Sequence, residues 1–397
     1  MKILYINSVY GYGSTGKIVR KLRTEAIAAG HDVYVIYGRK SAIGYKGSAA
    51  EEDQVWYIAN DLEQKVDIAS SVLFDSHGLH SRKNTERIIA KIREIQPDVI
   101  HMHNIHGFWL NYPLLMDYLR ASKIPVVWTL HDCWAYTGFC AYYDFNECGE
   151  WKNGCMRCRY RNEYPYRVFS DAHRNYLKKK EAFSHLNMIL VTPSAWLKKE
   201  VETSMLGKYP CRVVYNDVSL NDFYPDPGDL RTVHHLENKR VYLSVANVWT
   251  PQKGFQECMK LAGKLNENET LVMVGLSEKQ IRKLPAGILG ISHCDINELR
   301  HWYSTCDAYF NPTLEDNYPT VNLEADACEA PIVTYNTGGS PESAGENAMV
   351  VDRYDVDAAL VQLRNASREK PRKQNVLKKP MSQEYLSLYE QARRISK

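Results

Sequence analysis

Short apolar runs rich in β-branched residues alternate with amphipathic helical runs along almost the whole chain. Such runs are typical of strands buried on both faces, which carry apolar residues without alternation. In order they are KILYIN, DVYVIYG, DVIHMHN, IPVVWTL, MILVTPS, RVYLSVANV, TLVMVG, ILGISH, DAYFNP, APIVTY and AMVVD. Strands that alternate with helices form parallel sheets covered by helices on both faces. The sequence therefore predicts an α/β protein with doubly wound, Rossmann-like sheets.

The chain divides into two predicted domains. With 397 residues it is too long for a single compact core. The strand series restarts after CRVVYNDVSLNDFYPDPGDL, whose Asn, Asp and Pro content indicates a linker. We expect residues 1–215 and 216–381 to form two domains that face each other across a cleft. Residues 382–397 form an amphipathic helix, marginal alone in water, that we expect to return to the first domain.

Composition excludes several classes of protein. The 50 Lys and Arg nearly balance the 47 Asp and Glu, so no global charge favours nucleic acid. No stretch approaches the roughly 20 consecutive apolar residues of a membrane span. The N-terminal MKILYINSVY has no small-residue cleavage site and is interpreted as a strand, not a signal peptide. We therefore expect a cytoplasmic protein.

A glycine-rich loop, Gly11-Tyr12-Gly13-Ser14-Thr15-Gly16-Lys17, follows the first strand. It nearly matches a phosphate-binding P-loop, but Ile18 stands where that motif needs the Ser or Thr that holds magnesium, which argues against a P-loop NTPase. Two interpretations stay open. The glycines permit close packing of helix on strand, or the amides around Gly13 and Ser14 approach a ligand phosphate or hydroxyl at a helix N-terminus.

Two segments of the second domain carry candidate donor-binding residues. In SVANVWTPQKG, Asn247 follows a strand and Lys253 begins the next helix. A cation at this position can hold a diphosphate, and an ordinary exposed lysine is the alternative interpretation. The stronger segment is TLEDNYPTVNLEADACEAPIVTYNTGGSPE. Its carboxylates can accept hydrogen bonds from sugar hydroxyls, and free amides of the helix N-terminus can bind phosphate. The candidates in it are Asp316, Asn317, Tyr318, Pro319, Thr320, Val321, Glu324, Gly338 and Gly339.

These motifs together resemble GT-B glycosyltransferases of family four, retaining enzymes that use nucleotide sugars. The resemblance includes the glycine loop, TLHD at 129–132, YND at 215–217, QKG at 252–254, the acidic segment and the returning helix. Asp316 stands where the family normally has Glu, and Val248 where it has Arg. More narrowly, GSTGK, HDCWAYTGFCAY and LEDNYPT resemble bacterial polysaccharide-assembly transferases of the colanic-acid and capsule type.

The resemblance implies a retaining hexosyltransferase that uses a nucleoside-diphosphate sugar and a saccharide or lipid-linked saccharide acceptor, with no catalytic metal. It implies that His131 contacts the donor sugar, Lys253 neutralises the leaving diphosphate, Asp316 orients the hexose and Glu324 holds the ribose. Alternatives are a sugar-nucleotide epimerase of the same architecture and an inactive nucleotide-sugar-binding protein. For His131, a buried, hydrogen-bonded strand-end histidine is the alternative, but HD at a strand end favours the functional role.

Residues 132–185 hold five of the ten cysteines and look like an insertion in the first domain. Four of them follow the pattern C-x7-C-x6-C-x2-C, in a segment with few apolar runs to form its own core. Four thiolates can bind a structural zinc ion, while buried free thiols and disulfides remain alternatives. The predicted ligands are Cys140, Cys148, Cys155 and Cys158.

Two segments of the first domain, RYRNEYPYRVF at 159–169 and NYLKKKEAF at 175–183, combine aromatic and basic residues. Clustered Lys and Arg are attracted to an anionic leaflet. We expect peripheral contact with the inner face of the membrane, with an ordinary solvated helical face as the alternative.

Overall fold

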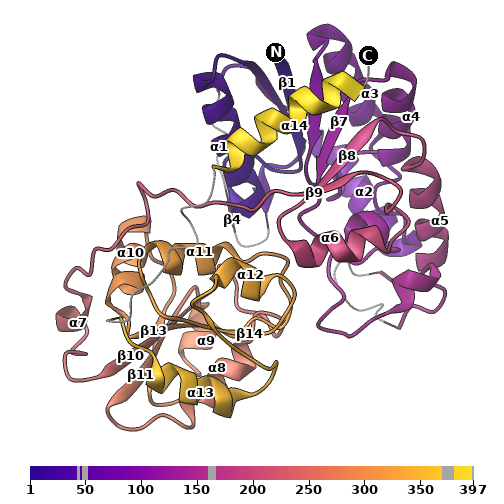
Figure 1. Ribbon diagram of the computed structural model, residues 1–397. Coiled ribbons are helices and arrows are strands. Elements are labelled where there is room, and N and C mark those ends of the chain that lie inside the picture. The colour runs from indigo at the N-terminus through magenta and orange to yellow at the C-terminus, as the bar shows by residue number, and fades with distance from the viewer. Residues whose placement is uncertain (43–44, 47–51, 160–166, 369–379, 396–397) are drawn as a thin grey trace. The chain divides into compact units, whose positions relative to one another are not determined.

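The computed structural model describes the chain except residues 43–44, 47–51, 160–166, 369–379 and 396–397. The chain forms two compact units, whose residues can be followed in Figure 1 with the colour bar. The first unit contains Met1–Tyr215 and Lys379–Lys397, and the second contains Asn216–Lys378. Each unit is built on its own parallel sheet.

The first unit has a seven-stranded parallel sheet with the order β5-β2-β1-β6-β7-β8-β9. Helical crossovers follow β1, β5, β6, β7 and β8, as is usual for parallel strands. The strands are β1 (Lys2–Asn7), β2 (Asp32–Tyr37), β5 (Val55–Tyr57), β6 (Val99–Met102), β7 (Val126–Thr129), β8 (Met188–Thr192) and β9 (Cys211–Val213). The helices are α1 (Gly13–Ala28), α2 (Asp61–Phe74), α3 (Arg82–Ile95), α4 (Tyr112–Ser122), α5 (Ala172–Ala182), α6 (Ala195–Glu202) and α14 (Met381–Ile395), with 3-10 turns η1 (Trp134–Tyr136) and η2 (Glu150–Asn153). A two-stranded antiparallel pair joins β3 (Ser41–Ala42) and β4 (Tyr45–Lys46).

The second unit has a six-stranded parallel sheet with the order β12-β11-β10-β13-β14-β15. Its strands are β10 (Arg240–Val245), β11 (Glu269–Val274), β12 (Ile288–Ile291), β13 (Ala308–Asn311), β14 (Ile332–Tyr335) and β15 (Met349–Val351). Its helices are α7 (Leu230–Val233), α8 (Phe255–Ala262), α9 (Glu278–Ile281), α10 (Ile296–Thr305), α11 (Thr320–Ala327), α12 (Ser340–Ala344) and α13 (Val356–Asn365).

Every predicted strand run contains a strand of the structure, and the α/β prediction is confirmed. Two short strands at the margins of the first sheet were not predicted. β5 is only partly buried, and β9 falls inside the stretch interpreted as a linker. The segment interpreted as an insertion ends in α5, which is the crossover helix between β7 and β8.

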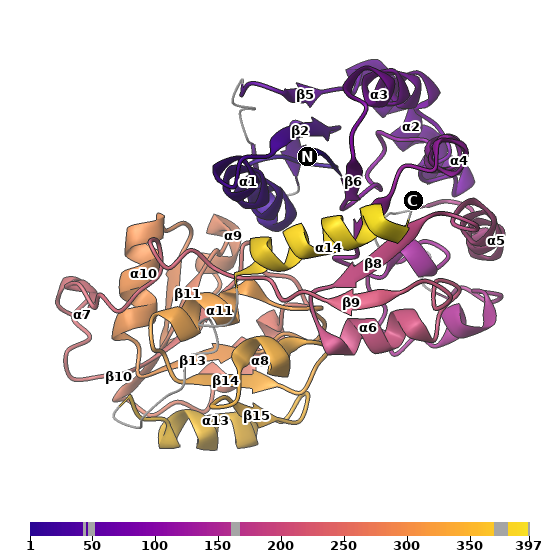
Figure 2. The ribbon, with the colours of Figure 1, turned by 45° about the horizontal axis from the view of Figure 1, so that its top comes forward.

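The last helix, α14, completes the core of the first unit. Its buried residues recur three or four apart, which gives one apolar face. They are Met381, Tyr385, Leu388, Tyr389 and Ala392. This face packs against α1, β6 and β7. Figure 2 shows α14 lying across the first unit, near α1 and β6. In the described part of the chain no helix is both long and apolar enough to span a bilayer.

Candidate functional site

In the first unit, candidate residues gather where three adjacent strands end. Asn7 ends β1, His103 follows β6 and His131 follows β7. Because the strands are parallel, their carboxyl ends lie at one edge of the sheet, where open α/β sheets bind ligands. A small pocket at this edge is lined by His103, His131, Asp132 and their neighbours.

His131, the predicted catalytic residue of this unit, is hydrogen-bonded to a second histidine. Its Nε2 lies 2.9 Å from Nδ1 of His103, and the two rings are stacked with centroids 5.2 Å apart. Burial lowers the pKa of His131 to about 4. The imidazole is therefore neutral near pH 7 and can act as a hydrogen-bond donor or acceptor rather than as a cation.

Asp132, the next residue, pairs with a third histidine. Nε2 of His106 lies 2.7 Å from Oδ2 of Asp132, and the amide of Trp134 donates to Oδ1. Burial by itself would raise the pKa of Asp132, but His106 and the amide hold the pKa below its ordinary value. The sequence reasoning selected His131 and missed the pair of His106 and Asp132, although HD at a strand end was the available signal.

The glycine loop begins α1 at the same edge. Gly13 has φ +63°, a backbone conformation that favours glycine. A Cβ at Gly16 would lie 3.2 Å from the backbone N of Gly11, so close packing requires a small residue there. Ser14 is exposed on the first turn. The loop is tied to the sheet by buried Asn7, whose Nδ2 lies 3.4 Å from Oγ1 of Thr15. Both interpretations of the loop are compatible with this geometry.

A wider pocket of the first unit, unassigned by the sequence reasoning, lies beyond β2 and β5. Its lining includes Arg39, Lys40, Tyr57, Asp61 and Gln64. The ammonium of Lys40 stands 4.5 Å from the centre of the Tyr57 ring. An aromatic side chain with a few convergent polar groups is a common lining of ligand pockets.

In the second unit, Lys253 and Asp316 form a direct ion pair. The Nζ of Lys253 lies 2.6 Å from Oδ2 of Asp316, and the amide of Tyr318 donates to Oδ1 at 3.2 Å. The lysine side chain is 39% exposed and the aspartate side chain 17%, so the ammonium is the more accessible to a ligand. The two predicted catalytic residues of this unit are thus brought together.

The loop that carries Asp316 is held by a glycine turn. Gly338 has φ +52°, and a Cβ there would come within 2.1 Å of the Asp316 carbonyl oxygen. The amide of Gly339 donates to that same oxygen at 3.1 Å. A side chain at position 338 would therefore displace the loop. Contact with the Asp316 carbonyl is thus enough to account for this glycine turn, and no ligand is needed to explain it.

α11 begins directly after this loop. Its N-cap residue, Pro319, offers no side-chain cap to the amides of the first turn, including those of Thr320 and Val321. Uncapped first-turn amides form an anion-binding arrangement. Asn317, Tyr318 and Pro319 are buried and support the loop, whereas Asn247 after β10 is exposed.

Glu324 lies one turn further along α11. It accepts a hydrogen bond from the Tyr303 hydroxyl at 3.0 Å. Burial, followed by the charges of Glu324 and Asp316, raises the pKa of Tyr309 on β13. Both carboxylates therefore influence the same buried tyrosine, and their predicted roles stay a prediction.

A buried polar network beneath this edge was not predicted. Asn322 on α11 accepts from Asn311 Nδ2 at 2.8 Å and donates to Ser343 Oγ at 2.8 Å. Thr334 and Ser340 are hydrogen-bonded to each other at 2.7 Å. The network fixes α11 and α12 on the strands β13 and β14.

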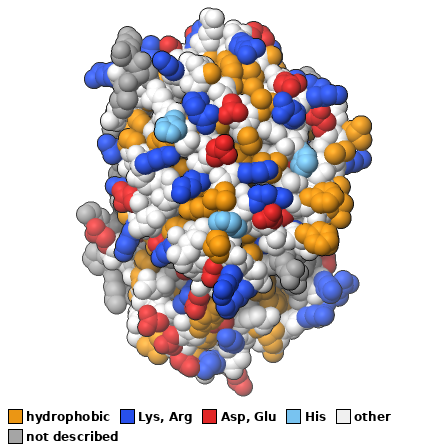
Figure 3. Space-filling model, turned by 90° about the vertical axis from the view of Figure 1, so that its right-hand side faces the viewer, with side chains coloured by type: hydrophobic (Ala, Val, Ile, Leu, Met, Phe, Trp, Pro, Cys, Tyr) orange, Lys and Arg blue, Asp and Glu red, His pale blue; other side chains and the backbone are white. Residues whose placement is uncertain are grey.

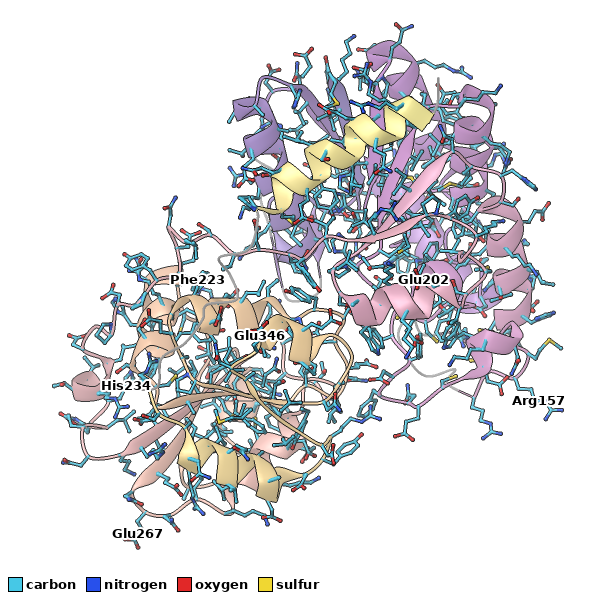
Figure 4. The ribbon with its side chains drawn as sticks, viewed as in Figure 1. Arg157, Glu202, Phe223, His234, Glu267 and Glu346 are labelled. Carbon is cyan, nitrogen blue, oxygen red and sulfur yellow. The ribbon has the colours of Figure 1, made fainter. Side chains whose placement is uncertain are left out.

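The four predicted zinc ligands lie in the segment between η1 and α5. All ten cysteines of the chain are free thiols. Burial, followed by the charges of Cys158 and Cys155, raises the pKa of Cys140. Arg157, which lies between Cys155 and Cys158 in the sequence, is exposed and is labelled in Figure 4. Among the described residues, no group of three or more His, Cys, Asp or Glu is arranged to hold a metal ion. The zinc site stays a prediction.

Comparison with known protein families identifies both units. A model of Glycosyltransferase Family 4 matches residues 15–222, more than half of the chain. The chain belongs to glycosyltransferase family 4. A second model, Glycosyl transferases group 1, matches residues 239–366 in the second unit. The resemblance inferred from the sequence motifs is confirmed.

Relatives of this family member include a protein named for colanic acid biosynthesis. The glycosyl transferase WcaC of Escherichia coli strain K12 is 25% identical over 362 residues, which cover 86% of this chain and 85% of WcaC. Sucrose-phosphate synthase from Thermosynechococcus elongatus matches with TM-score 0.64 and 14% identity over 100% of this chain and 92% of that chain. HepE from Anabaena, in complex with UDP, matches with TM-score 0.61 and 14% identity, covering 99% and 95%. The structural matches confirm the GT-B fold.

The buried histidines make the stability of this family member depend on pH. Burial lowers the pKa of each of His77, His101, His103 and His131. Between the folded and unfolded pKa values the unfolded chain binds more protons, so stability falls as pH drops below about 6.5, by up to about 1.4 kcal/mol per pH unit for each histidine. Asp67 and Asp75, whose pKa burial raises, act in the opposite direction. We expect urea unfolding to give a lower stability at pH 5.5 than at pH 7.5. Equal or higher stability at pH 5.5 would contradict this prediction.

Proposed function

We propose that this family member transfers a hexose from a nucleoside-diphosphate sugar to a saccharide or lipid-linked saccharide during bacterial surface polysaccharide assembly, with retention of configuration. The observation that carries the proposal is the ion pair of Lys253 and Asp316 beside the uncapped N-terminus of α11. A cation, a carboxylate and free amides together complement a sugar diphosphate, which presents both anionic oxygens and hydroxyl groups.

The proposed chemistry needs no protein nucleophile. The bond between the anomeric carbon and the diphosphate oxygen breaks, and the acceptor hydroxyl forms its bond on the same face. The hydroxyl proton passes to the departing diphosphate oxygen. Lys253 and the first-turn amides of α11 stabilise the charge that develops on the diphosphate. Asp316 orients the hexose and Glu324 holds the ribose. In the first unit, neutral His131 hydrogen-bonds the substrate. No catalytic metal is part of the proposal.

Related proteins support the substrate classes. HepE is known in complex with UDP and with UDP-glucose, which supports a nucleotide-sugar donor here. WcaC is named for colanic acid biosynthesis, and the structural neighbours WaaB and WaaG are named for lipopolysaccharide synthesis. These names support a saccharide acceptor. A sugar-nucleotide epimerase would convert the donor with no acceptor present, so a donor-only assay separates it from a transferase.

Nucleotide binding can be tested without knowledge of the acceptor. We expect thermal unfolding in the presence of UDP, GDP and their sugars to show a higher Tm for at least one nucleotide family. A ligand at 100 times its Kd stabilises the folded state by about 2.7 kcal/mol. AMP serves as the control for nonspecific nucleotide binding. If none of these diphosphates raised the Tm, the proposal would be wrong.

Two substitutions test the assigned contacts of the second unit. We expect Lys253→Ala and Glu324→Ala each to lower kcat by about 100-fold, since loss of one preorganised contact costs on the order of 3 kcal/mol in the barrier. Lys264→Ala is the matched control, because Lys264 forms an exposed ion pair with Asp357 at 2.6 Å in the same unit. Normal turnover of either variant at saturating donor would remove that residue from the mechanism.

We also propose peripheral membrane contact, for which the structure suggests a different surface from the one predicted. Residues 160–166 of the first predicted segment lie outside the described residues. In the second, Lys179 is buried and donates to the carbonyls of Trp134 and Thr137, and burial lowers the pKa of Lys179 to about 7. Lys179 therefore cannot contact lipid. Lys178 and Lys180 remain exposed.

The new surface is α2, which buries polar side chains and exposes apolar ones. Asp67 faces inward and accepts from Ser71 and Ser81. The exposed residues are Leu62, Val66, Ile68, Leu73 and Phe74, with Val168 and Phe169 beside them through a hydrogen bond from the Val168 amide to the Val72 carbonyl. Arg174 places a cation beside these side chains, since its Nη2 donates to the Phe74 carbonyl at 2.9 Å. Exposed apolar side chains next to a cation suit an anionic bilayer surface. Figure 3 shows the side of the molecule that lies at the right in Figure 1, where apolar side chains are exposed among Lys and Arg.

Vesicle flotation tests this surface. We expect the protein to float with phosphatidylglycerol-containing vesicles, and binding to weaken with salt. The double substitution of Phe74 and Phe169 by Ser should abolish flotation, since it removes the two largest exposed apolar side chains of the surface. Val361→Ser, at an exposed valine on α13, is the control. No flotation of the unmodified protein, or equal loss in both variants, would contradict the proposal.

A further inference from the structure

Two tyrosines of α14 contact the strands β6 and β7. The Tyr389 hydroxyl lies 2.6 Å from Nδ1 of His101, and the Tyr385 hydroxyl lies 2.8 Å from Oγ1 of Thr129. Nε2 of His101 lies 2.8 Å from the same Thr129 oxygen. Thr129 ends β7, two residues before His131. A helix from the end of the chain is thus bonded to the strand that carries the candidate histidine.

The direction of these hydrogen bonds follows from counting donors and acceptors. The Tyr389 hydroxyl donates to the Tyr5 hydroxyl, so it accepts from Nδ1–H of His101. Nε2 of neutral His101 is then an acceptor, and the Thr129 hydroxyl donates to it. Thr129 in turn accepts from Tyr385. Each of these groups has one consistent role, so the ring of His101 is held in a single orientation.

The ring of His101 packs against His103, which lines the pocket of the candidate site. Its ring centroid lies 4.0 Å from that of His103, which is itself 1% exposed. Nδ1 of His103 is bonded to Nε2 of His131, while Nε2 of His103 is buried with no hydrogen-bond partner in the described part of the chain. Orphaned buried N–H groups are rarer than orphaned acceptors. The proton of His103 is therefore on Nδ1 and is donated to His131.

We infer that α14 positions His131: Tyr385 and Tyr389 lock His101, His101 packs on His103, and His103 fixes the tautomer of His131 with its proton on Nδ1. This inference rests on the proposed function, in which His131 contacts the substrate. His101, His103, Tyr385 and Tyr389 are positioning residues. With its proton on Nδ1, His131 accepts from His103 through Nε2, so Nε2 is not the atom that takes a proton from the substrate.

The tautomer can be observed directly in the full chain labelled with 15N-histidine. Long-range 15N–1H spectra distinguish Nδ1–H from Nε2–H imidazole, and the His131 signal is identified by its loss in His131→Gln. We expect the Nδ1–H pattern for His131. In Tyr389→Phe we expect a mixture of tautomers and an approximately tenfold lower kcat, with donor KM unchanged; one hydrogen bond of about 1.4 kcal/mol corresponds to this factor.

Matched variants separate positioning from general destabilisation. Tyr209→Phe also removes a tyrosine hydrogen bond in the first unit, from its hydroxyl to the Phe183 carbonyl at 2.7 Å, and should leave the His131 signal unchanged. His103→Asn, whose amide can donate to His131, should retain the Nδ1–H pattern, whereas His103→Leu should lose it. If Tyr389→Phe does not fold, Tyr385→Phe tests the same network.

An Nε2–H pattern for His131 in the unmodified protein would overturn the inference. So would identical His131 spectra in Tyr389→Phe and Tyr209→Phe. The spectra require no substrate, so absence of sugar transfer by the unmodified protein would refute the proposed function alone.

Discussion

Parallel strand pairing is the constraint on which both candidate edges depend. Because all strands of a sheet run the same way, the residues that follow β1, β6 and β7 meet at one edge, and those that follow β10, β13 and β14 meet at another. The side chains that begin the intervening helices are brought to the same edges. Residues far apart in the chain thereby become neighbours without any local sequence signal.

Apolar strand runs and their order could be predicted because a strand that is buried on both faces consists of consecutive apolar residues. The marginal strand β5 was not predicted, since all three of its residues are only partly buried and it forms no such run. The polar buried face of α2 inverts the usual pattern and hides its orientation from a periodicity argument. For these elements, tertiary contacts decide what local pattern does not.

The candidate site, too, could be predicted only in part from the sequence. Motif spacing located Lys253, Asp316 and Glu324, but the ion pair joins residues 63 positions apart and is not visible in either motif. The contact of His101 with Tyr389 spans 288 positions. The sequence identifies the candidate residues, while the partners that orient those residues are products of the fold.

The position of α14 has a consequence for synthesis. Residues 381–395 complete the apolar core of the first unit, yet they leave the ribosome only after the whole second unit has been translated. Domains generally fold in order of synthesis, but this one cannot finish first. During translation, the sheet face that later receives Tyr385, Leu388 and Tyr389 is exposed. The nascent chain therefore carries an uncovered apolar surface for the time needed to make the second unit, and a truncated product would retain it.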